Sequence, residues 1–223
     1  LTTSSGASAP PIAGTVMLYL LALSRGLPRW LQAQAAHEWS PAPFRDLDGQ
    51  GLLVVGYGPI GREVVRLATA FGMRPTVLRR SAHGDEGCPV RPLSELTDAV
   101  RHADAVVVAL PLAPETRGII SADVIGSMPS RAVFVNVGRG ELVDQVALTD
   151  ALESGRLAGA GLDVFDPEPL PAGDTLWDLP NVIISPHTSG SSDGTAGRVA
   201  EIFLDNLARF VRNEPLRNEV QRP

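Results

Sequence analysis

Short apolar runs alternate with helically spaced apolar positions along most of the chain. The runs, rich in β-branched residues, cover 52–55, 76–79, 105–110, 132–137, 159–165 and 181–185. Helical spacing covers 60–71, 93–102, 121–128 and 145–154. This alternation is typical of βαβ units, whose parallel sheet is covered on both faces. We therefore predict an α/β fold, a doubly wound parallel sheet of the Rossmann type.

Two further helices flank this region. The first opens at Pro10 and Pro11, extends to about residue 37, and is apolar on all sides around 16–23, which predicts burial in a core or a subunit contact. Gly26 and Pro28 should bend or break it. The last helix spans about 191–212 and is followed by a polar tail. Its apolar stripe contains Val199, Ile202, Phe203 and Phe210.

Composition narrows the function classes. With 223 residues and 44% hydrophobic residues, the chain can form a sizeable core. The formal net charge of −6 argues against an electrostatic nucleic-acid partner, and the apolar stretch at 17–23 is too short to span a bilayer. The single Cys88 excludes an internal disulfide and a cysteine-rich metal site, so we expect a cytoplasmic setting and no metal. Because the apolar stretch is so short, we also expect no membrane partner.

A glycine loop at the end of the first run predicts a dinucleotide site. Gly56, Gly58 and Gly61 have the fingerprint spacing between a strand and a helix. The first glycine makes the turn, the second lets the backbone approach the pyrophosphate, and the third lets helix and strand pack closely. The free N–H groups of the helix N-terminus then face the phosphates.

The residues after the second run indicate which dinucleotide is preferred. An NAD site usually has an acid here that accepts a hydrogen bond from the ribose 2′-OH, but this chain has Arg79, Arg80 and Ser81. Two guanidinium groups and a hydroxyl suit a 2′-phosphate. We therefore expect NADP(H) to be preferred, with NAD(H) possible. The alternative is that both arginines are simply exposed at a strand end.

Three polar segments follow the later runs, at 136–140, 163–171 and 185–190, and should meet at the carboxyl edge of the sheet. With these segments and 110–116, residues 5–220 resemble the D-isomer-specific 2-hydroxyacid dehydrogenases, and the Arg-Arg-Ser resembles their NADPH-preferring glyoxylate and hydroxypyruvate reductases. The resemblance implies a catalytic set of Arg139, Glu168 and His187. The resemblance also implies further cofactor contacts, in addition to the glycine loop and residues 79–81. These are Pro59, Ile60, Leu110, Pro111, Thr116, Val137, Gly138, Asp163, Ser189 and Gly190.

The chemistry of each side chain fits these roles. Reduction of a 2-keto acid needs a hydride and a proton, and an imidazole such as His187 can supply the proton. Glu168 can hold one ring nitrogen and stabilise the imidazolium, and Arg139 can grip the substrate carboxylate. By resemblance, Asp163 lies near the nicotinamide and fixes its carboxamide.

Other candidates receive less weight. Asp166 is a rival to Glu168, but the resemblance places the catalytic acid directly before Pro169. We expect His37, His83 and His102 to be structural and Cys88 to be incidental. The aromatic side chains of Phe165 and Trp177 should pack.

The resemblance also bears on domain organisation. It implies a dinucleotide-binding domain over 6–190, whose N-terminal helix resembles a dimer-forming segment. Residues 191–223 would return to a substrate domain whose first half is absent from this chain, so the chain alone should bind cofactor and catalyse poorly. We expect a homodimer acting on a small 2-keto or 2-hydroxy acid. Two alternatives remain, an NAD-dependent phosphoglycerate-type dehydrogenase and a non-catalytic dinucleotide-sensing protein.

Overall fold

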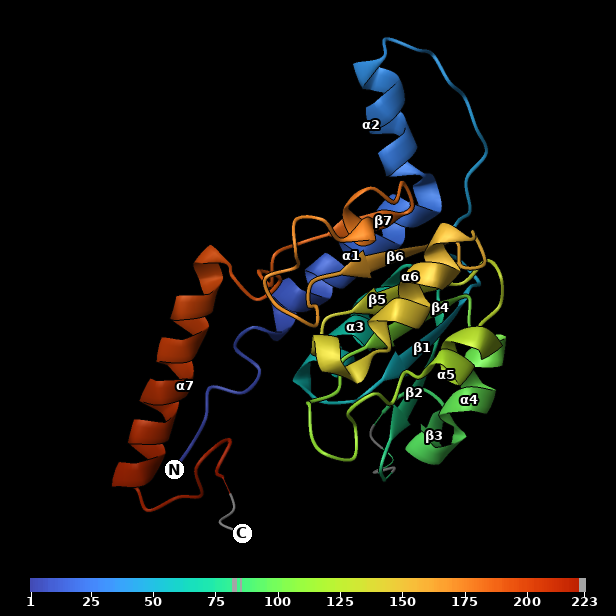
Figure 1. Cartoon of the computed structure of the whole chain (residues 1–223). Coiled ribbons are helices and arrows are strands. Elements are labelled where there is room, and N and C mark those ends of the chain that lie inside the picture. The colour runs from blue at the N-terminus through green and yellow to red at the C-terminus, as the bar shows by residue number, and fades with distance from the viewer. Residues whose placement is uncertain (82–83, 85, 221–223) are drawn as a thin grey trace.

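The computed structural model describes residues 1–81, 84 and 86–220. Its centre is one sheet in which the neighbouring strands pair in parallel, in the order β3-β2-β1-β4-β5-β6-β7 (Figure 1). The strands are β1 (Gly51–Val55), β2 (Arg74–Arg79), β3 (Val90–Pro92), β4 (Ala105–Val108), β5 (Val133–Asn136), β6 (Gly159–Leu162) and β7 (Val182–Ile184). The order reverses between β1 and β4, which is where a doubly wound sheet opens a ligand crevice.

Helices cover both faces of the sheet, as predicted. Alternate strand residues point to opposite faces, so Leu52 and Val54 pack under α1 and α3, while Leu53 and Val55 face a second core beneath α4–α6. The helices are α1 (Ala9–Arg25), α2 (Leu27–Ala35), α3 (Pro59–Ala70), α4 (Leu96–Ala99), α5 (Ala122–Ser127), α6 (Gln145–Glu153) and α7 (Asp193–Val211). Short 3-10 turns are η1 (Leu93–Glu95), η2 (Val100–His102), η3 (Gly140–Leu142) and η4 (Thr175–Trp177).

The predicted elements are confirmed with two differences. Strand β3 was not predicted, because its three residues follow a polar loop and show no alternating pattern. The helix expected at 93–102 is instead a four-residue α-helix between two 3-10 turns. The predicted break in the first helix lies at Gly26, whose φ of 71° ends α1 and starts α2.

The apolar α1 is buried on the sheet because small residues let it approach closely. Tyr19 is 1% exposed and lies against Gly161 of β6, where a Cβ atom would overlap the tyrosine ring. Among the described residues no single helix is long and apolar enough to cross a membrane, although the bent pair α1–α2 passes that test of length and composition.

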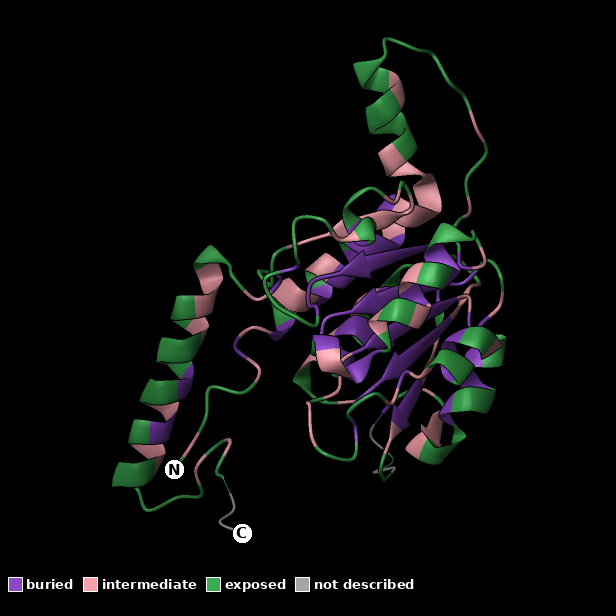
Figure 2. Cartoon of the chain, in the orientation of Figure 1, coloured by how far each residue is buried: buried purple, intermediate pink, exposed green. Residues whose placement is uncertain are grey.

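Two helices lie outside the sheet layers (Figures 1 and 2). None of the residues of α2 is buried, and α7 buries only Ile202 and Asn206. The predicted stripe of α7 is largely uncovered, since Phe203 and Phe210 are 65% and 71% exposed. The described chain ends run together beside α7, where Thr2 pairs with Glu219.

Candidate active site

The carboxyl edge of the sheet gathers the predicted site segments. The glycine loop follows β1, residues 109–116 follow β4, and Arg139 lies just after β5. Glu168 is in the loop after β6, and His187 is three residues beyond β7. Because parallel strands end at the same edge, segments that are more than a hundred residues apart in sequence face one region.

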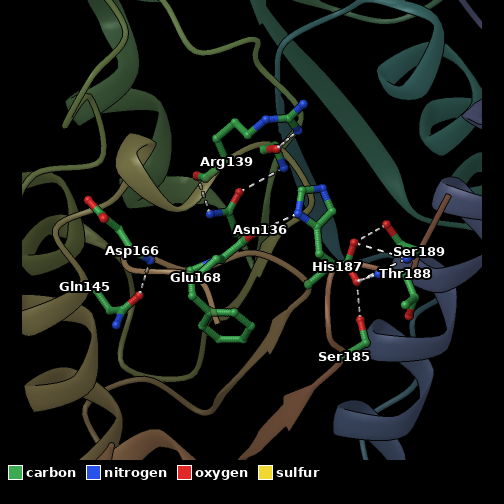
Figure 3. Close-up of polar contacts among 12 residues, drawn as sticks. Asn136, Arg139, Gln145, Asp166, Glu168, Ser185, His187, Thr188 and Ser189 are labelled. Carbon is green, nitrogen blue, oxygen red and sulfur yellow. Dashed lines mark hydrogen bonds and ion pairs between the residues drawn. The ribbon is translucent and has the colours of Figure 1, made fainter. Parts of the chain in front are cut away.

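His187 and Glu168 form a hydrogen-bonded pair (Figure 3). Nδ1 of His187 lies 2.9 Å from Oε2 of Glu168, and Oε1 of Glu168 accepts from the backbone N–H of Phe165 at 2.9 Å. Both side chains remain partly open to solvent, with 46% exposure for His187 and 35% for Glu168. In the described part of the chain, Nε2 of His187 makes no hydrogen bond, so this nitrogen can meet a ligand.

The charge state of Glu168 determines which way this hydrogen bond runs. Burial raises the pKa of Glu168, but hydrogen bonds from His187 and Phe165 and the positive charges of His187 and Arg139 outweigh it, so the net pKa is lowered. Glu168 is therefore ionised at neutral pH and accepts from Nδ1–H. In neutral His187 this places the lone pair on Nε2, and protonation puts an acidic proton there.

The turn that carries His187 is held by Asp163. The φ of His187 is +52°, in the left-handed region that non-glycine residues seldom adopt. Its N–H donates to the carbonyl oxygen of Asp163 at 2.8 Å. The Asp163 carboxylate, on a residue that is 1% exposed, accepts from the N–H of Thr188 at 2.9 Å, from the N–H and hydroxyl of Ser189, and from the hydroxyl of Ser185 (Figure 3).

Arg139 enters the site on a loop that is fixed at both ends. Asn136, at the end of β5, donates to the carbonyl oxygen of Arg139 and accepts from the N–H of Gly138 (Figure 3). Gly140 lies so close to Phe165 that a Cβ atom would overlap the Phe165 carbonyl group. This contact brings the arginine loop against the loop of Glu168. One guanidinium nitrogen, Nη1, donates to the carbonyl oxygen of Gly138, and the exposed guanidinium keeps further donors for an anion.

The glycine loop has the geometry that the fingerprint requires. A Cβ atom on Gly61 would overlap the carbonyl oxygen of Gly56, so only glycine allows α3 to start this close to β1. Gly58 has nothing within 4 Å of the position of a Cβ atom, which leaves its face open to a ligand. Pro59 is the first residue of α3, and Ile60 packs against the core. These residues fit a dinucleotide pyrophosphate at the N-terminus of α3.

A cavity of about 480 Å³ extends from the glycine loop along the sheet edge. Of the predicted cofactor residues it includes Gly56, Gly58, Arg79, Arg80, Ser81, Leu110, Pro111 and Thr116. Five residues that were not singled out as cofactor contacts also line it, namely Tyr57, Leu93, Ala109, Ala113 and Glu115. Tyr57 lies within the predicted glycine loop, and Ala113 and Glu115 lie within the predicted segment 110–116, so only Leu93 and Ala109 fall outside these segments. The hydroxyl of Thr116 stabilises the turn over residues 111–116, because it donates to the Pro111 carbonyl oxygen and accepts from the N–H of Ala113.

The structure modifies the expectation for Arg79. Its side chain is 18% exposed, and Nη1 lies 2.7 Å from Oε1 of Glu86, whose side chain is 2% exposed. Arg79 is therefore not a free, exposed arginine. Arg80 and Ser81 are exposed at the cavity.

The remaining predicted residues lie near the site without lining this cavity. Val137 and Ser189 are buried, and Gly190 packs beside Ser8. Phe165 is buried as predicted. Trp177 was expected to pack but is 49% exposed, and its Nε1 donates to the Pro171 carbonyl oxygen. His83 lies outside the described residues. Burial raises the pKa of Cys88, which makes its thiol less reactive.

Comparisons with known proteins agree with this geometry. Residues 17–189 match the model of the D-isomer specific 2-hydroxyacid dehydrogenase NAD binding domain. A glyoxylate reductase of Korarchaeum cryptofilum is 40% identical over 182 residues, covering 79% of this chain and 54% of that protein. A D-3-phosphoglycerate dehydrogenase of Methanocaldococcus jannaschii is 33% identical over 97% of this chain and 42% of that protein.

A solved structure is similar throughout the chain. A D-isomer specific 2-hydroxyacid dehydrogenase of Xanthobacter autotrophicus in complex with NADPH and MES superposes with a TM-score of 0.87 at 32% identity. The match covers 99% of this chain and 91% of that chain. The chain spans about half the length of the curated relatives described above.

Proposed function

This chain belongs to the D-isomer specific 2-hydroxyacid dehydrogenase family, and we propose that it carries the cofactor site and catalytic side chains of an NADPH-dependent reductase of small 2-keto acids such as glyoxylate or hydroxypyruvate. The observation that carries the proposal is the hydrogen bond between Nδ1 of His187 and Oε2 of Glu168, which leaves Nε2 open at the carboxyl edge of the sheet. This intact pair favours a catalytic function over a dinucleotide-binding scaffold without chemistry.

His187 is the proton donor in this proposal. Glu168 holds Nδ1, so the transferable proton of the imidazolium lies on Nε2. A dinucleotide held by the glycine loop would supply the hydride for reduction of the carbonyl carbon. As negative charge develops on the carbonyl oxygen, His187 donates its proton there, and the negative charge of Glu168 stabilises the imidazolium before that transfer.

Arg139 is the substrate-binding cation. Its guanidinium extends from the β5 loop on the side of the site that the imidazole also faces (Figure 3). A planar guanidinium can hold a carboxylate through two parallel hydrogen bonds, which orients the adjacent carbonyl group of a 2-keto acid. Asp163 keeps the His187 turn in place, and we further propose that this turn borders the nicotinamide.

The preference for NADP(H) rests on the end of β2. Arg80 and Ser81 are exposed at the cavity, and Arg79 lines it. The solved relative that contains NADPH has the same fold over 99% of this chain, which supports the assignment. NAD(H) remains the second cofactor, and the match to the NAD binding domain and the phosphoglycerate dehydrogenase relative support an NAD-dependent, phosphoglycerate-type alternative.

A turnover assay tests the function. In the protein expressed from its complete reading frame, NADPH oxidation is measured with glyoxylate, hydroxypyruvate and a panel of small 2-keto acids. We expect turnover that falls by roughly 100-fold or more in His187→Ala, with NADPH affinity nearly unchanged. Binding of NADPH without oxidation by any 2-keto acid would favour a dinucleotide-sensing protein. A His187→Ala variant with near-normal kcat would remove His187 from the acid role.

We also propose a cytoplasmic homodimer, with residues 191–223 belonging to a second, substrate-binding unit. The exposed Trp30 and Leu31 of α2, and Trp39 in the following connector, support a subunit contact there. Light scattering at micromolar concentration checks this, and a monomeric mass contradicts it.

A further inference from the structure

An acidic side chain lies behind the predicted 2′-phosphate site. Glu86 follows β2 by seven residues, and its side chain is 2% exposed. Oε1 lies 2.7 Å from Nη1 of Arg79, and Oε2 accepts from the backbone N–H of Gly84 at 2.9 Å. Glu86 does not line the cofactor cavity, whereas Arg79 does. The carboxylate therefore contacts the arginine from the protein side.

Tyr57 of the glycine loop completes this arrangement. Its hydroxyl donates to the carbonyl oxygen of Glu86 at 2.8 Å, and its ring lies 5.6 Å from the guanidinium carbon of Arg79. Arg62, on α3, also lies over this ring, at 5.1 Å. The glycine loop, the end of β2 and Glu86 are thus joined through two side chains, and Arg79 has a fixed position at the cavity wall.

The ion pair changes the charge that a ligand meets. A 2′-phosphate is attracted to Arg79, Arg80 and the hydroxyl of Ser81, but it is also repelled by the carboxylate of Glu86 directly behind Arg79. Because Glu86 is buried, water screens this repulsion poorly. A 2′-OH carries no charge and is insensitive to it.

We propose that Glu86 is a selectivity-determining residue, an internal counter-charge that reduces the preference for NADP(H) over NAD(H) by partly neutralising Arg79. The inference rests on the proposed cofactor preference of the site. It predicts that a strand end with two arginines also accepts NAD(H). Its effect is on the ratio of the two affinities and not on the proton transfer at His187.

Equilibrium binding to the complete protein tests this without turnover. Dissociation constants for NADP⁺ and NAD⁺ are measured by calorimetry for the wild type and for Glu86→Gln, which keeps the side-chain shape and removes the charge. We expect NADP⁺ to bind about five- to tenfold more tightly and NAD⁺ to change by less than about twofold. Glu95→Gln is the matched control, since it removes the same charge from an exposed ion pair with Arg91 on a neighbouring turn, and its affinity ratio should stay at the wild-type value.

A second pair of variants tests the same charge pair from the side of Arg79, and Arg79→Gln leaves Glu86 in place. Arg79→Gln should lose NADP⁺ selectivity, and the double variant Arg79→Gln/Glu86→Gln should recover most of it because the bare carboxylate is gone. An unchanged ratio in Glu86→Gln, weaker NADP⁺ binding there, or no recovery in the double variant overturns the proposal. A shifted ratio in a protein that reduces no 2-keto acid would refute the proposed activity and leave this inference standing.

Discussion

Nδ1 of His187 and Oε2 of Glu168 lie 2.9 Å apart although their loops follow two different strands, β7 and β6. These strands are neighbours in the sheet, paired from Ala160–Val182 to Leu162–Ile184. The pairing of the strands therefore sets the position of the two side chains, and the ionised Glu168 then sets the tautomer of His187. Changes to either side chain or to the packing of these loops should affect proton transfer before they affect cofactor binding.

Replacing Glu168 by Gln tests this relationship. The variant keeps an acceptor for Nδ1–H but removes the counter-charge of the imidazolium, so we expect kcat to fall by about tenfold or more while NADPH affinity stays near the wild-type value. Steady-state rates and a cofactor titration measure both. Asp166→Asn is the control, because it removes an exposed carboxylate from the same loop. A larger loss in Asp166→Asn would move the acid role to Asp166.

The lowered pKa of Glu168 gives a pH prediction with a definite sign. A carboxylate whose folded pKa is depressed stabilises the fold above its unfolded pKa, and this contribution is lost as pH falls through the folded value. Urea unfolding at pH 7 and at decreasing acidic pH should show wild type losing stability relative to Glu168→Gln as the pH falls from the ordinary glutamate pKa towards the lowered pKa of Glu168. The effect should be small, because the side chain is 35% exposed. The prediction is contradicted if the difference in unfolding free energy between wild type and Glu168→Gln is already lost at pH 6.

The sequence predicted much of this site because strand ends carry recognisable chemistry. The glycine loop, Arg139, Glu168 and His187 each follow a short apolar run, and such runs become parallel strands that end at one edge. The pairing of Glu168 with His187 was expected from the family resemblance, which placed the catalytic acid directly before Pro169, while its length and the support of Asp163 for the turn were not.

Contacts that depend on tertiary packing escaped prediction. Glu86 lies in a polar segment with no periodic pattern, and nothing in the sequence indicates that its side chain turns inward to Arg79. The stripe of α7 suggested an amphipathic helix, but periodicity cannot say that Phe203 and Phe210 would be exposed in this chain. Strand β3 is held by pairing with β2 and not by its own three residues.

The close contact between Gly140 and Phe165 predicts that substitution of Gly140 lowers kcat, although Gly140 touches no reacting group. In Gly140→Ala the new methyl group overlaps the Phe165 carbonyl group, so the loops of Arg139 and Glu168 must separate. We expect a loss of about 1–3 kcal/mol in unfolding free energy and a clear fall in kcat. Gly126→Ala is the matched control, because Gly126 is an exposed position of α5 with nothing within 4 Å of a Cβ atom, and it should be neutral or stabilising. Equal behaviour of the two variants in thermal unfolding and kinetics would contradict the prediction.

Substitutions of two fingerprint glycines should have different effects, one on the stability of the fold and the other on cofactor binding. Gly61→Ala forces a methyl group onto the Gly56 carbonyl oxygen and should lower the melting temperature. Gly58→Ala has space around its Cβ and a φ of −81° that alanine tolerates, so its melting temperature should stay unchanged. Its methyl group would nevertheless occupy the face left open for the pyrophosphate and weaken cofactor binding by about tenfold. Normal cofactor affinity in a folded Gly58→Ala would move the pyrophosphate away from this loop.

Asp163→Asn tests how the His187 turn is maintained. The buried carboxylate accepts hydrogen bonds from Ser185, Thr188 and Ser189, and an amide would replace one acceptor oxygen by a group that donates. We expect a loss of about 2 kcal/mol or more in unfolding free energy, measured in urea. Because the left-handed backbone of His187 is strained, it should relax when these bonds weaken, and kcat should fall even with NADPH saturating.

Tyr19→Phe is the control for the hydrogen bonds of Asp163, since the Tyr19 hydroxyl contacts Ser185 and not Asp163 itself. The Tyr19 hydroxyl lies 2.5 Å from the hydroxyl of Ser185, which itself donates to Asp163. Its removal should lower the unfolding free energy by about 1 kcal/mol and leave kcat at the wild-type value, because Asp163 keeps its donors. If Asp163→Asn loses stability but retains full kcat, the backbone of His187 is fixed by other contacts, such as the bond from its N–H to the carbonyl oxygen of Ser185 at 3.0 Å.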